Sequence, residues 1–228
     1  MKKVGINLIV LILLGGFTFA QEINKIDAQG ERTGVWKKYY PNKQLRYEGE
    51  FKNGKEIGVF KFYAMSSSKH PLVLKTYNPD LKEVKVQFFT KNGIIESEGM
   101  MLDKKRIGLW TYYHSDGKTI MIEENYDNGQ LSGVYTLYYK NTQITKTEHY
   151  KNGKLHGNSK QYTTTGILTE DINYVDGYLQ GNAVYYEING AIKLKGRYKE
   201  DLKVGMWEFY VDGKLKKTKE VEKGIFKN

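Results

Sequence analysis

Residues 34–58 decide the fold, and they read GVWKKYYPNKQLRYEGEFKNGKEIG. The six residues after the opening glycine are rich in Val, Trp and Tyr, which favour strands. A Pro-Asn turn follows, and residues 45–51 then resemble a second strand. Asn53-Gly54 supplies the left-handed backbone that a tight turn requires. This stretch therefore predicts one β-hairpin.

The same pattern recurs along the chain with a period of 24 to 26 residues. We number positions from the opening residue, position 0, which is glycine in seven of eight copies; the third copy opens with Val84. Position +5 is aromatic in all eight copies. A fixed period of this length is typical of a repeat array. The predicted structural residues of the repeat are Gly34, Trp36, Tyr39, Gly58, Phe60, Tyr63, Phe89, Gly108, Trp110, Tyr113, Gly133, Tyr138, Gly157, Tyr162, Gly181, Tyr186, Gly205, Trp207 and Tyr210.

The predicted fold is all-β: an elongated single-sheet array of about eight β-hairpins, with no helix after the N-terminal segment. Each hairpin should extend the sheet by about 10 Å, and the result should be a long, twisted ribbon. Positions +2 and +5 have opposite parity, so a regular strand points them to opposite faces. Either a bulge intervenes or both faces are partly covered.

The N-terminal segment has the layout of a secretory signal peptide. Lys2 and Lys3 precede an apolar run at residues 8–14, and small residues follow before Gln21. The run is shorter than the about 20 residues of a membrane-spanning helix, although a retained anchor is the alternative. We therefore expect a signal peptide at residues 1–20, a lead-in or cap at 21–33 and the repeat array at 34–228, in an exported protein.

The amino-acid composition excludes several kinds of chemistry and indicates which partners the charge favours. The chain has no cysteine, which excludes a lipoprotein anchor, disulfides and thiol chemistry. Without residues 1–20 it keeps 34 basic and 26 acidic residues, a net charge of +8. Such a balance favours acidic partners or anionic surfaces, although solubility alone also explains it.

The search for catalytic chemistry finds no candidate. The four histidines do not have metal-ligand spacing, and no nucleophile elbow or phosphate-binding loop occurs. Adjacent acids such as Glu123-Glu124 point to opposite faces of a strand. We predict no enzyme activity, no cofactor and no metal. Nucleic acid is an unlikely partner, because the aromatic residues beside lysines follow the structural period.

The repeat resembles the MORN variant of bacteria, where MORN stands for membrane occupation and recognition nexus. Its motif appears as GVWKKYY at 34–40, GLWTYY at 108–113 and GMWEFY at 205–210, and the turn between repeats as YKNGKLHG at 150–157. The resemblance spans about residues 26–228. It implies a β-hairpin array and kinship with YwqK-type antitoxins of toxin–antitoxin systems. Eukaryotic relatives of the repeat are associated with membranes and anionic lipids.

We therefore expect an exported, non-enzymatic scaffold that binds a protein, a toxin-like one on the resemblance, through the long face of the ribbon. The expected exposed row is Lys37, Lys61, Thr111, Thr136, Lys160 and Glu208. The alternative is charge-driven attachment to anionic envelope lipid or polymer. The long tip at residues 66–71 is either a functional loop or a tolerated insertion. Lysines in the last strand, residues 214–221, should protect its edge from aggregation.

Overall fold

The computed structural model describes residues 22–222 and 224–226, all in strands and connecting turns. The predicted signal peptide, residues 1–20, lies outside the described residues. The strands are β1 (Lys25–Ile26), β2 (Arg32–Tyr39), β3 (Leu45–Lys52), β4 (Lys55–Phe62), β5 (Val73–Tyr77), β6 (Val84–Phe89), β7 (Ile95–Leu102), β8 (Lys105–Tyr113), β9 (Ile120–Asp127), β10 (Gln130–Tyr138), β11 (Ile144–Lys151), β12 (Lys154–Leu155), β13 (Gly157–Tyr162), β14 (Leu168–Val175), β15 (Tyr178–Tyr186), β16 (Ile192–Lys199), β17 (Leu202–Val211), β18 (Lys214–Glu222) and β19 (Ile225–Phe226).

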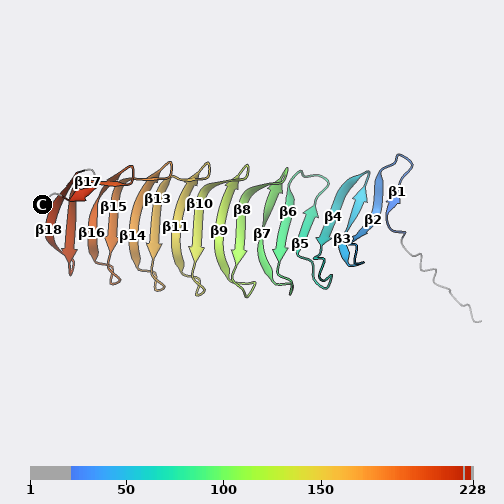
Figure 1. Cartoon of the computed structure of the whole chain (residues 1–228), viewed down its shortest axis with the longest axis horizontal. Helices are drawn as coiled ribbons and strands as arrows, with labels where there is room; N and C mark the ends of the chain where they lie inside the picture. Colours follow the sequence, from blue (N-terminus) through green and yellow to red (C-terminus); the bar gives the residue numbers. More distant parts are fainter. Residues whose placement is uncertain (1–21, 223, 227–228) are drawn as a thin grey trace, which may run out of the picture.

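Strands that follow one another in the chain pair antiparallel, except that β11 pairs with both the short β12 and β13, so the sheet is one continuous meander. Figure 1 shows a single-layered ribbon with the first strands at one end and the last at the other. The prediction of an elongated, helix-free hairpin array is confirmed for the described residues. Among them, no helix is long and apolar enough to cross a membrane.

The ribbon is flatter than the twisted one we expected. The strand axes keep nearly the same orientation along most of the length of the ribbon (Figure 1). Strand twist normally accumulates across a sheet, and flat sheets of many strands depend on specific side-chain ladders. The ladders described below run across the strands, so they provide the reason for the difference.

Most repeat glycines lie inside strands rather than at their starts, and Gly157, the first residue of β13, is the exception. β4 begins at Lys55 and β8 at Lys105, three residues before Gly58 and Gly108. Gly108 has φ of 60°, and a Cβ built on it would meet no atom within 4 Å. The left-handed backbone, and not a lack of space, therefore requires glycine here. The pairing register shifts beside such glycines, as between Glu98 and Met100 opposite β8, which marks a bulge in every such strand.

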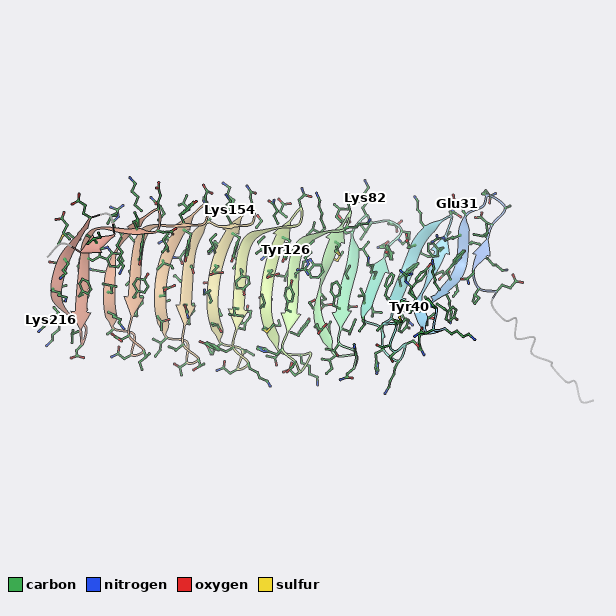
Figure 2. The ribbon with its side chains drawn as sticks, in the orientation of Figure 1. Glu31, Tyr40, Lys82, Tyr126, Lys154 and Lys216 are labelled. Atoms are coloured by element: carbon green, nitrogen blue, oxygen red, sulfur yellow. The ribbon has the colours of Figure 1, made fainter. Side chains whose placement is uncertain are left out.

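Turns on the two long edges connect the strands. In Figure 2, Glu31, Lys82 and Lys154 lie along one edge and Tyr40 lies near the other. We call the edge that holds Asn53-Gly54 and its equivalents the turn edge. There, the glycine N–H donates to a carbonyl of the preceding repeat, which links successive turns into a chain. These bonds are Gly54 to Arg32, Gly129 to Arg106, Gly153 to Leu131 and Gly177 to Leu155, at 2.8–3.0 Å.

Candidate binding face

The two faces of the ribbon have different chemistry. The face that carries position +2, including Phe60, Trp110 and Trp207, is the ring face. The face that carries position +3 and position +5 is the ladder face. Trp110 lies against Gly99, whereas the Tyr113 hydroxyl donates to Glu98, and residues 98 and 99 point to opposite faces. Positions +2 and +5 therefore lie on opposite faces, even though a bulge precedes them. The sequence left open either a bulge or side chains that cover part of both faces, and the structure has both.

The ring face contains the buried residues that hold the array together. Trp110 and Trp207 are fully buried and Phe60 is 3% exposed. Each of these rings covers a glycine on the preceding strand, where a Cβ would collide with the ring: Gly49 under Phe60, Gly99 under Trp110 and Gly196 under Trp207. Each hairpin is thereby packed on the one before it. The glycine lies eleven residues before its ring each time, a spacing that was readable in the sequence but that we missed.

A cation covers the other side of each buried tryptophan. The Arg106 guanidinium lies 4.2 Å from the Trp110 ring centre, and the Lys203 ammonium lies 4.5 Å from that of Trp207. Arg32 lies 5.2 Å from Trp36 in the same way. All three cations occupy position −2. Where position +2 is Tyr135, Ser159 or Ala183, position −2 is leucine instead, at Leu131, Leu155 and Leu179. The second and third repeats do not follow this pairing, because Phe60 has Glu56 at position −2 and Val86 has Lys82. In the three tryptophan repeats, the cation over the ring is favourable.

The ladder face carries three parallel bands along the ribbon. The aliphatic band is position +1 and contains Val35, Val59, Leu109, Val134 and Met206, while Lys85, Asn158 and Asn182 occupy this position in the other three repeats. The charge band is position +3 with the residues paired to it on neighbouring strands, such as Glu48, Glu98 and Asp171. The tyrosine band is position +5 and contains Tyr39, Tyr63, Phe89, Tyr113, Tyr138, Tyr162, Tyr186 and Tyr210.

Ion pairs in the charge band cross from strand to strand. Glu48 on β3 contacts Lys37 on β2 at 3.3 Å and Lys61 on β4 at 3.2 Å. Lys195 contacts Glu208 at 3.0 Å, and Lys85, which occupies position +1, contacts Glu98 at 2.8 Å. Burial disfavours the charged form of Glu48, but hydrogen bonds from Lys61, Lys37 and Tyr63 outweigh it and lower its pKa. The lysines of this band are therefore occupied within the fold.

Hydroxyl groups of the tyrosine band donate to the same acids. Tyr63 donates to Glu48 at 3.1 Å, Tyr113 to Glu98 at 2.8 Å and Tyr138 to Glu123 at 2.7 Å. Burial, together with the bonded carboxylate, raises the pKa of each of these three hydroxyls to about 12. Tyr210 donates to Glu208 at 2.5 Å on its own strand. These rings are held in fixed positions and stay protonated at neutral pH.

The aliphatic band is the exposed apolar feature of the ladder face. Exposed fractions are 47% for Val59, 49% for Leu109, 41% for Val134 and 55% for Met206. Two shallow hollows lie on this face at equivalent places, of about 260 Å³ beside Val35 and Val59 and about 330 Å³ beside Met206. Each also borders a strand glycine, Gly49 or Gly196, and groups of the charge band. Position +1 was readable in the sequence, but we did not single it out.

The structure corrects one member of the expected exposed row. Thr136 is only 8% exposed, because it lies within the sheet between Glu123 and Thr147. Lys61 is exposed, while Lys37, Thr111, Lys160 and Glu208 are half-buried. All six lie on the ladder face, where the ion pairs and tyrosine hydroxyls cover part of them. The prediction of full exposure for Thr136 is therefore wrong.

The His149 and His156 side chains each contact a polar group of a neighbouring strand or turn. His149 Nδ1 is 2.8 Å from the Asn158 carbonyl, and His156 Nδ1 is 3.2 Å from Asp176 Oδ1. Within residues 22–222 and 224–226, no group of three or more His, Asp or Glu side chains could hold a metal ion.

The long tip at residues 66–71 packs on neighbouring turns. The Ser68 hydroxyl donates to Gln44 at 3.1 Å, and the His70 ring lies over Gly93. At the opposite edge, the loop after β5 borders a hollow of about 670 Å³ with Lys52, Lys55 and Lys82 around it. Both features occur in the second repeat, which departs from the common pattern.

Two segments match a known family. Residues 32–53 and 155–176 match the MORN repeat variant. These two segments are similar to that repeat. The matched segments cover β2 to the turn after β3, and β12 to the turn after β14, which are equivalent hairpins of the array. No curated protein matches the chain significantly. MORN repeats generally mediate protein or membrane binding, which is compatible with a non-enzymatic scaffold.

Proposed function

We propose that this chain is a non-enzymatic binding scaffold that holds a protein partner through the aliphatic band of its ladder face. One observation carries the proposal: four apolar side chains that are 41–55% exposed, Val59, Leu109, Val134 and Met206, lie in one row, and polar residues take this position between Val59 and Leu109 and between Val134 and Met206. An apolar strip beside charged groups matches the apolar core and polar rim of protein interfaces. The ring face is the weaker candidate, because its large side chains are used to pack the repeats.

Polar groups beside the band would fix the register of the partner. Position +3 of the charge band lies two residues from position +1 on the first strand of each repeat, and both signs of charge are present in the band. Its ions are already paired, so we expect them to contribute specificity rather than most of the affinity. The two hollows next to Val59 and Met206 offer places for bulky apolar side chains of the partner.

The experiment is a cross-linking pull-down with the purified chain from an envelope extract. We expect wild type to retain the same protein at low and moderate salt, and Leu109→Asp with Val134→Asp to lose at least about tenfold of it, because a buried hot-spot contact contributes about 2 kcal/mol or more. Ile188→Asp is the matched control, since Ile188 is 78% exposed in a loop away from the band. Recovery of no stable partner, or equal loss in both variants, contradicts the proposal.

The narrower proposal is an exported chain whose partner is a toxin-like protein. Its support is the signal-peptide layout of residues 1–20 and the resemblance to YwqK-type antitoxins. Cell fractionation of the tagged full-length chain tests export, and retention of the tag in the cytoplasm contradicts it. Co-expression with an exported toxin encoded beside the gene tests the second part. A toxin that stays active when the chain is present argues against it.

Attachment to an anionic surface is the second candidate. The observation that favours it is the exposed lysine cluster on β18, at Lys214, Lys216 and Lys217. Vesicle flotation in rising salt distinguishes it, because surface charge attraction is screened within about 8 Å at physiological ionic strength. Anionic vesicles should bind at low salt and detach as salt rises. Equal binding to neutral and anionic vesicles eliminates this candidate.

A further inference from the structure

The tyrosine band is a straight row of aromatic rings with a constant step. One ring occurs in each of the eight repeats, and each repeat contributes two strands. Strands lie about 4.8 Å apart, so successive rings are about 10 Å apart along the ribbon. Because the ribbon is flat, the row runs in a line and does not wind around the molecule (Figure 1).

The rings are partly open and held in place. Tyr39 is 51% exposed, and the other seven rings of the band are half-buried. Hydroxyl bonds to Glu48, Glu98 and Glu123 fix Tyr63, Tyr113 and Tyr138. A side chain that is already ordered loses little rotamer entropy when a ligand arrives. A row of fixed, half-exposed rings is a prepared platform for flat apolar surfaces.

The charged groups beside the rings are paired with one another and do not favour an ionic ligand. The carboxylates of Glu48, Glu98 and Glu208 lie within 3.1 Å of the tyrosine hydroxyls and are ionised, because hydrogen bonds lower their pKa values. Each carboxylate is also paired with lysine: Glu48 with Lys37 and Lys61, Glu98 with Lys85 and Glu208 with Lys195. Neither sign of charge is therefore left over to attract an ionic ligand. The same carboxylates, together with Lys37, Lys61 and the Thr111 hydroxyl, can bond to neutral hydroxyl groups.

A neutral polymer with flat apolar faces, many hydroxyls and a matching repeat fits this row. Pyranose rings have such faces of C–H groups, and an extended β-1,4-linked glycan repeats every disaccharide, at nearly the same step as the protein's about 10 Å. We propose that the tyrosine band binds an extended β-1,4-linked glycan, with one disaccharide on each repeat. The sugar faces stack on the rings, and the charge band bonds to the sugar hydroxyls. This site is separate from the aliphatic band, and it goes beyond the protein-binding proposal.

Length dependence is the first test, with isothermal titration of the chain without residues 1–20. The probes are cello-oligosaccharides and N-acetylated chito-oligosaccharides of two to eight sugars, which separate glucose from N-acetylglucosamine polymers. We expect affinity to rise at least about tenfold from two to eight sugars, because each added disaccharide reaches another ring. Affinity that does not depend on length, or no binding of either series, overturns the proposal.

Substitutions in the tyrosine band test whether it is the glycan-binding site. Tyr113→Ala with Tyr138→Ala should weaken the eight-sugar probe at least about tenfold, while Tyr178→Ala, at a 56% exposed tyrosine near the turn edge, should not. Tyr113→Phe with Tyr138→Phe keeps the rings and protects the test against misfolding, and it should retain most of the binding. Loss in Tyr178→Ala equal to that in the alanine pair, or complete loss in the phenylalanine pair, contradicts the assignment. Leu109→Asp should leave glycan binding unchanged, so failure here is separable from failure of the protein-binding proposal.

Discussion

At the scale of single residues, the array depends on pairs of a large ring and a missing side chain. Trp110 fits only because Gly99 on β7 has no Cβ, and Phe60 and Trp207 use Gly49 and Gly196 in the same way. The sequence pattern located the rings and the opening glycines. It did not reveal these partner glycines, because a glycine in a strand can equally mark a bulge or a bend.

The ring–glycine pair predicts a strong coupling. Gly99→Ala should lower the free energy of unfolding by about 1–3 kcal/mol, because the new methyl group collides with the Trp110 ring. In a Trp110→Val background, which copies Val86 of the third repeat, the same change should cost little or nothing. Urea unfolding followed by circular dichroism measures the double-mutant cycle. A cost of Gly99→Ala that is the same in both backgrounds would refute the packing described here.

Two glutamates should respond to pH with opposite signs. Burial raises the pKa of Glu170, with Glu148 adding repulsion against the attraction of Lys146. The ionised form therefore destabilises the fold at neutral pH, and this penalty fades as pH falls to the unfolded value of about 4.3. Glu170→Gln should stabilise at pH 7 and have little effect at pH 4.

Glu98 is the matched control for that measurement. Burial disfavours its charged form, but bonds from Lys85 and Tyr113 outweigh burial and lower its pKa. Its stabilisation is present above pH of about 4.3 and is lost as pH falls through the lower folded-state value. Glu98→Gln should therefore destabilise at pH 7 and lose its effect in acid. Thermal unfolding across this pH range checks both variants, and equal signs would contradict the two environments.

At the scale of elements, turn residues made the hairpins predictable from the sequence. The bulges could not be predicted in the same way. Asn53-Gly54 and its equivalents have the positive φ that their residue types favour. The glycines at position 0 also have positive φ, but they lie three residues into strands such as β4 and β8. Nothing local distinguishes a glycine that opens a strand from one that bulges within it. Only the pairing with the preceding strand settles the difference.

The outer edge of β18, in the last hairpin, carries lysines whose role can be tested. β18 pairs on its outer side with β19 only through Val221 and Glu222, so residues 214–220 have no outer partner strand in the described part of the chain. Lysines on such an edge oppose pairing with another sheet. Lys216→Val with Lys217→Val should cause self-association that grows with concentration in sedimentation velocity. Lys160→Val, on interior strand β13, is the control and should not; equal behaviour of the two would show that the edge is not protected by charge.

At the scale of the whole molecule, each repeat contacts its neighbours and little else. The shape could be predicted because the period fixes the step per repeat. The binding surface could be predicted only coarsely, since the period names equivalent positions without showing which face is used for packing. Thr136 illustrates the limit: its polar side chain and repeat position indicated exposure, but strands on both sides bury it.

The elongated shape predicts a clear solution signature. A compact protein of this length without residues 1–20 would have a radius of gyration of about 17 Å. Eight repeats of about 10 Å each should give a distinctly larger value and a long tail in the distance distribution from small-angle X-ray scattering. A value near the compact one would contradict the ribbon. High salt is the control, since a packed array should keep its dimensions when surface charge is screened.

The chained turns along one edge have an evolutionary consequence. Each turn bonds to the repeat before it through backbone atoms alone, as Gly153 N–H does with the Leu131 carbonyl. Such a backbone connection places few requirements on the side chains on either side. Unequal recombination that duplicates or deletes one unit therefore preserves these backbone connections, and descendants can lengthen or shorten their reach in whole units wherever the ring and the glycine at the new junction also match.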